Sequence, residues 1–162
     1  MPLIPESAVF QKRFAALPVA RFQAGDTVLG AGGRTGRLLI LKKGAVAVIK
    51  EGVEIAKVSE PGAVFGELSI LLAQPHTADV RALEASQFHV ADEALLAKEP
   101  LALTYIAMVL AARVYNANRA VIELKRQLND REPQSVIVET IAEIGANLVY
   151  AGYPFNPLSL AA

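Results

Sequence analysis

Short β-rich runs separated by glycine turns fill the chain from Val19 to Val90. The turns recur roughly every eight to twelve residues, a spacing typical of an antiparallel sandwich or barrel. The clearest unit is a hairpin, in which the alternating run Val46–Lys50 turns at Glu51-Gly52 into Val53–Lys57. We therefore expect a mainly β fold with flanking helices, built on an antiparallel β-barrel or jelly roll.

Helical periodicity flanks this β region on both sides. A short lead-in helix is expected over Pro5–Ala16, since Pro5 suits a first helical turn. After the β runs, the period of the apolar residues changes to 3.6, which predicts a short helix over Asp92–Lys98. A long C-terminal helix should begin at Pro100 and run to about residue 129.

The second half of the long helix carries a narrow apolar seam. Its members alternate in steps of three and four: Val114, Ala117, Val121, Leu124 and Leu128. Two apolar positions in every seven suit a second identical helix better than a globular core. The seam therefore predicts a homodimer, and the alternative is a helix packed on its own barrel.

The chain is 162 residues long, which is the size of one domain. We expect a functional unit over residues 1–130, followed over 131–162 by a short helix and an apolar tail that form no separate domain. The stretch from Ile144 to Ala162 carries no charge, but Gly145, Gly152, Pro154 and Pro157 interrupt it before it could span a membrane. We expect the tail to be buried or to face a partner.

The charge balance argues against nucleic acid as a partner. Sixteen basic and sixteen acidic side chains cancel, and Arg131 is the sole basic residue after Asp130. The 32 residues from 131 to 162 could not supply the phosphate contacts that DNA binding requires. We therefore expect no DNA binding within this chain. The N-terminus does not have the pattern of a secretory signal, and we expect a cytoplasmic protein.

The residues that say most about function lie in two adjoining segments, PGAVFGELSILL over residues 61–72 and AQPHTADV over residues 73–80. A glycine lets the backbone approach a ligand closely, and a short helix opening at Glu67-Leu68-Ser69 would point free N–H groups at an anion. A compact monoanion such as a cyclic phosphate fits that arrangement. The alternative is a tight turn between barrel strands with a solvated acid.

These segments resemble the phosphate-binding cassette of the cyclic-nucleotide-binding domain in the catabolite-activator family, and the likeness extends over about residues 15–130. The resemblance implies that cAMP or cGMP is the ligand. Gly66 and the amides near Leu68 would hold the phosphate, and Glu67 would accept a hydrogen bond from the ribose 2′-hydroxyl. The complete expected site is Phe65, Gly66, Glu67, Leu68, Ser69, His76, Thr77, Ala78 and Asn118.

Two of these residues also have simpler explanations. By the resemblance, the Thr77 hydroxyl would touch the phosphate, but a threonine is equally at home in a β-strand. Asn118 would read the edge of the base, yet an asparagine on an exposed helix face is common.

His76 stands where the family has an arginine that clamps the cyclic phosphate. An imidazole with a pKa near 6.5 is mostly neutral at pH 7 and cannot form the two parallel bonds of a guanidinium. Three interpretations stay open: a weaker phosphate contact, a residue with no nucleotide contact, or a pH-sensitive contact. Arg81 is a poor substitute, because five residues along a strand it would lie on the opposite face.

No Ser/His/Asp signature or pair of carboxylates typical of a catalytic site stands out in the sequence. A metal-dependent enzyme on a small barrel would need more than His76 and His89, and the chain contains no cysteine. We therefore expect a sensor module and not an enzyme. It would bind a cyclic nucleotide, signal through its C-terminal helix and act on an unknown downstream protein. The alternative is a degenerate family member that serves as an interaction module or binds another small ligand.

Overall fold

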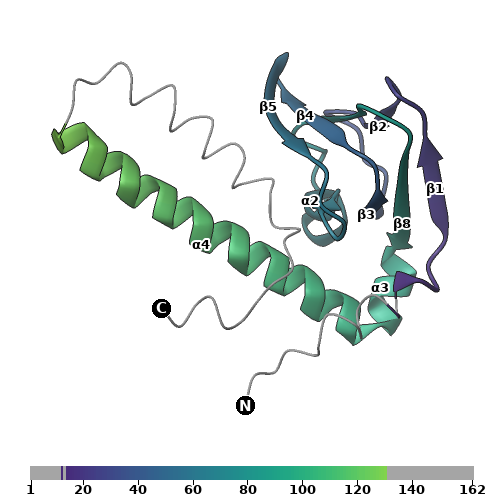
Figure 1. Ribbon diagram of the computed structural model, residues 1–162. Coiled ribbons are helices and arrows are strands. Elements are labelled where there is room, and N and C mark those ends of the chain that lie inside the picture. Colours follow the sequence, from purple (N-terminus) through teal and green to yellow (C-terminus); the bar gives the residue numbers. More distant parts are fainter. Residues whose placement is uncertain (1–11, 13, 131–162) are drawn as a thin grey trace.

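The structure is a computed structural model that describes residue 12 and residues 14–130, with side chains to residue 127 (Figure 1). Most of the predicted lead-in helix Pro5–Ala16 lies outside the described residues. The same holds for the predicted short helix and apolar tail over 131–162, and for the side chain of Leu128.

Two four-stranded antiparallel sheets form the body of the described chain (Figure 1). One sheet has the strand order β1-β8-β3-β6 and the other has the order β2-β7-β4-β5. The predicted jelly-roll class is confirmed. The strands are β1 Val19–Phe22, β2 Thr27–Leu29, β3 Arg37–Lys43, β4 Val46–Lys50, β5 Val53–Val58, β6 Val64–Phe65, β7 Asp79–Ala82 and β8 Ser86–Asp92.

The predicted hairpin is present as β4 and β5, with Val46 opposite Val58 and Lys50 opposite Val53. Both turn residues adopt positive φ angles, 53° at Glu51 and 80° at Gly52. Turns of this hand match the twist of the paired strands. The register shifts by one residue between Val48 and Ile49, which alternation alone did not predict.

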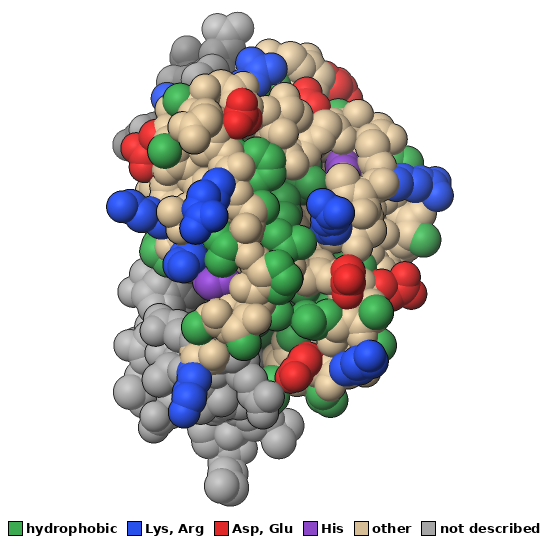
Figure 2. All heavy atoms as spheres, turned by 90° about the vertical axis from the view of Figure 1, so that its right-hand side faces the viewer, with side chains coloured by type: hydrophobic (Ala, Val, Ile, Leu, Met, Phe, Trp, Pro, Cys, Tyr) green, Lys and Arg blue, Asp and Glu red, His purple; other side chains and the backbone are tan. Residues whose placement is uncertain are grey.

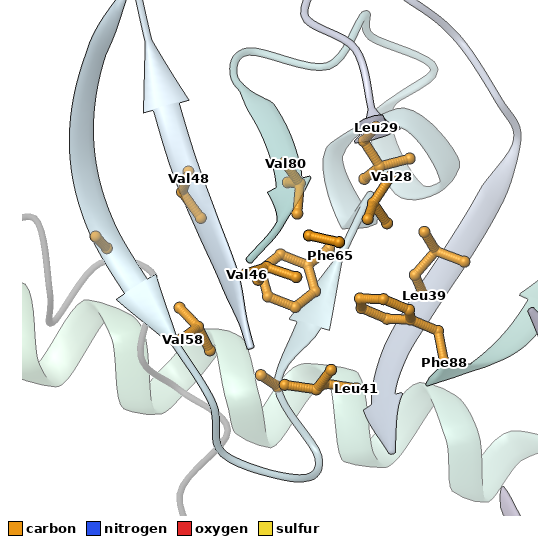
Figure 3. Packing of buried hydrophobic residues seen from close by; sticks show 13 residues of the cluster. Val28, Leu29, Leu39, Leu41, Val46, Val48, Val58, Phe65, Val80 and Phe88 are labelled. Carbon is orange, nitrogen blue, oxygen red and sulfur yellow. The ribbon is translucent and has the colours of Figure 1, made fainter. Parts of the chain in front are cut away.

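Apolar side chains from both sheets fill the space between them (Figure 3). Phe65 and Phe88 meet edge to face near the centre, with ring centroids 6.1 Å apart. Strand β3 contributes to this interior cluster through Leu39 and Leu41. Its alternate residues Leu38 and Ile40 are also buried, but in a second cluster against the helices. This two-sided burial explains why β3 has a continuous apolar run and no alternation.

Two helices follow the last strand: α3 Glu93–Lys98 and α4 Pro100–Asp130. Asp92 caps α3 by accepting a hydrogen bond from the Leu95 amide at 2.8 Å. The first half of α4 packs on the outer face of the β1-β8-β3-β6 sheet, where Ile106 and Val109 are buried. The second half of α4 extends away from the sheets (Figure 1).

The Pro100–Gln127 part of α4 is long and apolar enough to cross a membrane by length and composition. Helices that pack on a globular domain meet the same criterion, and the first half of α4 does pack here. Its second half has the predicted seam. Val114 and Val121 are exposed, whereas Ala117 and Leu124 are half-buried. The first half of the helix packs on its own barrel, and for the seam both the homodimer and the barrel-packing alternative stay predictions.

Charged side chains of both signs surround a strip of apolar ones on the face that carries β1 (Figure 2). This mixture agrees with the formal net charge of zero. The face in view therefore has no broad field of a single sign of the kind that draws proteins to nucleic acid.

Candidate functional site

A left-handed glycine forms the corner between β6 and α2, which spans Glu67–Leu72. Gly66 has a φ of 85°, and a Cβ placed on it would lie 2.5 Å from the carbonyl oxygen of Arg37. Only glycine combines this backbone conformation with so close a neighbour. The corner and the short helix were both predicted from the sequence, and both are present.

Replacing Gly66 by Ala should destabilise the domain by about 2 kcal/mol or more, because strain at positive φ adds to a backbone clash. The matched control is Gly52→Ala in the β4–β5 turn, where φ is 80° but nothing lies within 4 Å of the added Cβ. That control should cost about 1 kcal/mol. Urea unfolding measures both values, and equal losses would show that the Arg37 contact is unimportant.

Glu67, the first residue of α2, forms an ion pair with Arg113 of α4. Arg113 Nη1 donates to Glu67 Oε1 at 2.6 Å, and only 11% and 14% of the two side chains are exposed. Arg113 Nη2 donates to the carbonyl oxygen of Val64. The acid predicted to receive the ligand is thus joined directly to the long helix.

Sequence reasoning did not assign a role to Arg113. A signal was available, because Arg113 is the only charged residue between Leu101 and Asn118 of α4. A lone charge in an apolar helix needs a partner wherever the helix is buried. Its partner lies 46 positions away along the chain. Nothing in the sequence identifies that partner as Glu67.

A second contact ties α4 to the same segment of the barrel. The Tyr105 hydroxyl donates to the carbonyl oxygen of Gly62 at 2.8 Å, and burial raises the pKa of Tyr105 to about 12. Strand β6 lies at the edge of its sheet, so its outer backbone groups have no strand partner. Tyr105 and Arg113 satisfy two carbonyl groups at this edge and so position α4 against the cassette.

His76 is only 6% exposed and lies in a loop before β7, not within a strand. Its Nε2 is 3.0 Å from the hydroxyl oxygen of Thr35, with which it forms a hydrogen bond. Burial lowers the pKa of His76 below its ordinary value, while the negative charge of Glu67 opposes that shift. The imidazole is therefore neutral at pH 7 and close enough to Glu67 to sense its charge.

Arg81 and His76 do not share a strand, contrary to the prediction, because only Arg81 lies in β7. Arg81 is nevertheless a poor substitute for an arginine at position 76, because its side chain lies on the wrong face of the sheet. Val80 and Ala82 are buried in the interior, so the exposed Arg81 between them lies on the outer face of the sheet.

The family model of the cyclic nucleotide-binding domain matches residues 19–99, which include β1 to α3 and the whole cassette. The chain belongs to the cyclic nucleotide-binding domain family. Domains of the type found in catabolite activators and kinase regulatory subunits are regulatory and not catalytic. A comparison with curated protein sequences finds no match.

Solved structures share the fold of this cyclic nucleotide-binding domain. Thermus thermophilus catabolite activator protein is 19% identical with a TM-score of 0.57, and the match covers 88% of this chain and 82% of that one. PKAR CBD2 bound to Sp-2Cl-cAMPS is 24% identical with a TM-score of 0.55, covering 70% and 75%. The N-terminal domain of a Streptomyces coelicolor A3(2) transcriptional regulator is 24% identical with a TM-score of 0.53, covering 72% and 86%.

Some solved relatives are much longer than this chain. The match to cAMP-bound PfPKA-R is 23% identical with a TM-score of 0.48, and it covers 51% of this chain but only 29% of that one. The three structures with TM-scores above 0.5 show a common fold and nothing beyond the fold.

The remaining predicted site residues occupy different environments. Phe65 and Ser69 are buried, and Leu68 is half-buried beside the Gly66 corner. Thr77 is exposed in a bend before β7, so its interpretation as a strand residue was wrong. Ala78 packs against the interior cluster. The structure thus gathers the glycine corner, Glu67 and His76 in one region.

Asn118 is exposed on α4, and its side chain forms no hydrogen bond with a described residue, so no hydrogen bond joins it to the cassette. Two shallow surface hollows lie beside α3, with Asp92 and Leu95 in the walls of both. They include none of the predicted site residues. Within the described residues, no group of three or more His, Cys, Asp or Glu side chains could hold a metal ion.

Proposed function

We propose that this chain is a regulatory sensor that binds cAMP or cGMP at the Gly66–Ser69 corner. The family supports a cyclic nucleotide as the ligand. Glu67 Oε1 accepts from Arg113, while Oε2 forms no hydrogen bond with the described residues. That second oxygen is suited to accept a hydrogen bond from a ribose 2′-hydroxyl. The cytoplasmic location predicted from the sequence is part of this proposal.

The observation that carries the proposal is the Glu67–Arg113 ion pair. It joins Glu67, the residue expected to bind the ribose of the ligand, to helix α4. A hydroxyl bonded to Glu67 changes the strength and geometry of this buried pair. The position of α4 on the edge of β6 depends on the same arginine through the Val64 carbonyl group. Occupancy would therefore shift α4 relative to the barrel, as expected for a two-state element that the ligand biases.

The second half of α4 supports a homodimer as the signalling form. Val114 is 61% exposed and Val121 is 45% exposed, although both are large apolar side chains. They are one heptad apart, so a second copy of the helix could cover both. An unidentified downstream protein would then respond to the position of the paired helices.

Calorimetric titration with cAMP and cGMP tests the proposal. We expect heat that fits one site per chain for at least one nucleotide. The 2′-deoxy analogue should bind at least about tenfold more weakly, since it lacks the hydrogen bond to Glu67. No heat from either nucleotide at millimolar concentration would refute the proposed function. Mass measured in the same sample reports whether the chain is a dimer.

An interaction module is the second candidate, and the state of His76 favours it. The imidazole is buried and its Nε2 is already hydrogen-bonded to Thr35, so that nitrogen would have to exchange its partner to bind a phosphate. In that case the fold would be kept, with an empty pocket or another small ligand, and α4 would dock to a partner protein. A stable dimer that gives no heat of binding with either nucleotide would support this second candidate.

A further inference from the structure

The charged side chains of the cassette, taken together with Arg113 of α4, leave no surplus positive charge. Arg113 is neutralised by Glu67 at 2.6 Å, and Asp79 adds a second carboxylate, whose Oδ1 accepts from the Ala31 amide. His76 itself is neutral at pH 7, because burial lowers its pKa. A cyclic phosphate carries one negative charge, and binding it in a partly buried site without an unpaired cation would cost free energy. The described cassette contains no such cation.

A glycine-rich loop, Gly30–Gly36, lies directly against His76. The His76 amide donates to the carbonyl oxygen of Gly33, and the Gly32 amide donates to the carbonyl oxygen of His76, both at 2.8 Å. The side chain of Thr35 is bonded to the imidazole. The loop is therefore attached to position 76 by both its backbone and a side chain.

This loop also receives support from the segment that leads into β7. Asp79 Oδ1 accepts a hydrogen bond from the Ala31 amide at 2.6 Å. By contrast, a Cβ on Gly32 or Gly36 would meet nothing within 4 Å, and both glycines have positive φ. The loop is thus anchored beside His76 but open at Gly32 and Gly36, and its residues 31–36 are exposed, so the Arg34 side chain is not held by packing.

Arg34 is the one arginine of this loop, and it lies between Gly33 and Thr35, which both form hydrogen bonds with His76. It is exposed and forms no hydrogen bond or ion pair with the described residues. Two other arginines nearby are less suitable. Arg81 lies on the outer face of its sheet, and Arg37 borders the hollow beside α3 together with Asp92.

We propose that Arg34 supplies the cation that pairs with the cyclic phosphate of the bound nucleotide. The inference rests on the proposed function, because it needs a cyclic nucleotide at the Gly66 corner. The long guanidinium side chain would swing over His76 and form charge-assisted hydrogen bonds with the phosphate oxygens. In this arrangement the loop closes the phosphate side of the site, while His76 and Thr35 set the position of the loop.

Titration of Arg34→Gln with cAMP and with adenosine tests this inference. We expect cAMP affinity to fall at least about tenfold, since one charged hydrogen bond is lost. Adenosine has no phosphate, so its affinity should stay within about twofold. Arg34→Lys keeps the charge and should recover part of the loss. The exposed Arg81→Gln is the matched control and should change neither affinity.

The outcomes distinguish a failure of the inference from a failure of the function on which it rests. If the natural chain binds cAMP and Arg34→Gln binds it equally well, the inference fails while the proposed function stands. The inference is also overturned if Arg34→Gln loses as much affinity for adenosine as for cAMP, or if Arg81→Gln loses as much affinity for cAMP as Arg34→Gln does. In either case the effect would not depend on a phosphate contact from this loop. If the natural chain binds no cyclic nucleotide, both fail together. Thermal unfolding of each variant checks that the exposed substitutions leave the fold intact.

Discussion

Replacing Arg113 by Met should lower the free energy of unfolding by about 3 kcal/mol, because Glu67 would be left buried without its partner. Only 14% of the Glu67 side chain is exposed, so water cannot solvate the carboxylate fully. The carbonyl group of Val64, at the edge of β6, would lose its donor as well. Urea unfolding at pH 7 measures the loss.

The double variant Glu67→Gln with Arg113→Met separates the ion pair from the packing of the arginine. It should be more stable than Arg113→Met alone, since a neutral amide is less costly to bury than an unpaired carboxylate. Arg119→Met, an exposed arginine on the same helix, is the control and should change stability by less than about 0.5 kcal/mol. Equal losses for Arg113 and Arg119 would contradict the role of the pair.

Replacing His76 by Arg should tighten cyclic-nucleotide binding at least about tenfold. A guanidinium is always charged and can form two parallel bonds with a phosphate, whereas the neutral imidazole offers one donor. The same change removes the side-chain hydrogen bond to Thr35, while the backbone hydrogen bonds between position 76 and the Gly30–Gly36 loop can remain. Calorimetry at pH 7 measures the gain. An Arg variant with unchanged affinity would show that position 76 lies outside the site.

The pH dependence of the natural chain gives an independent check on His76. In the ligand-free domain, burial holds the His76 pKa below its ordinary value of 6.5, so the imidazole is neutral. A phosphate beside the ring would raise that pKa in the complex, so binding would take up a proton. Affinity should therefore rise as the pH falls through the pKa of the complex. It should level off below the pKa of the free domain. The affinity of the His76→Arg variant should not depend on pH in this range.

The strand pattern, the hairpin and the helices could be predicted because they depend on short-range rules. Alternation and glycine turns place β4 and β5, and a change of period marks α3 and α4. The Gly66 corner was predictable for a similar reason, since a glycine before a short helix serves a local backbone conformation. The bulge at Val48 and Ile49 was not, because register depends on the partner strand.

The site was only partly predictable, for reasons that particular residues illustrate. Glu67 and His76 were named from the cassette pattern, but their partners Arg113 and Thr35 are 46 and 41 positions away. Sequence spacing carries no information about contacts of that range. His76 was assigned to a strand, and its actual place in a loop follows from backbone bonds to Gly32 and Gly33.

The sequence alone determined the class of fold, the glycine corner at residue 66 and the position where a histidine replaces an arginine. These features are local, since each depends on a residue and its near neighbours along the chain. Only the tertiary structure decided that Arg113 would neutralise Glu67 and that a glycine-rich loop with its own arginine would lie against His76. Folding brings these distant segments together, and burial then sets which charges are paired and which imidazole stays neutral.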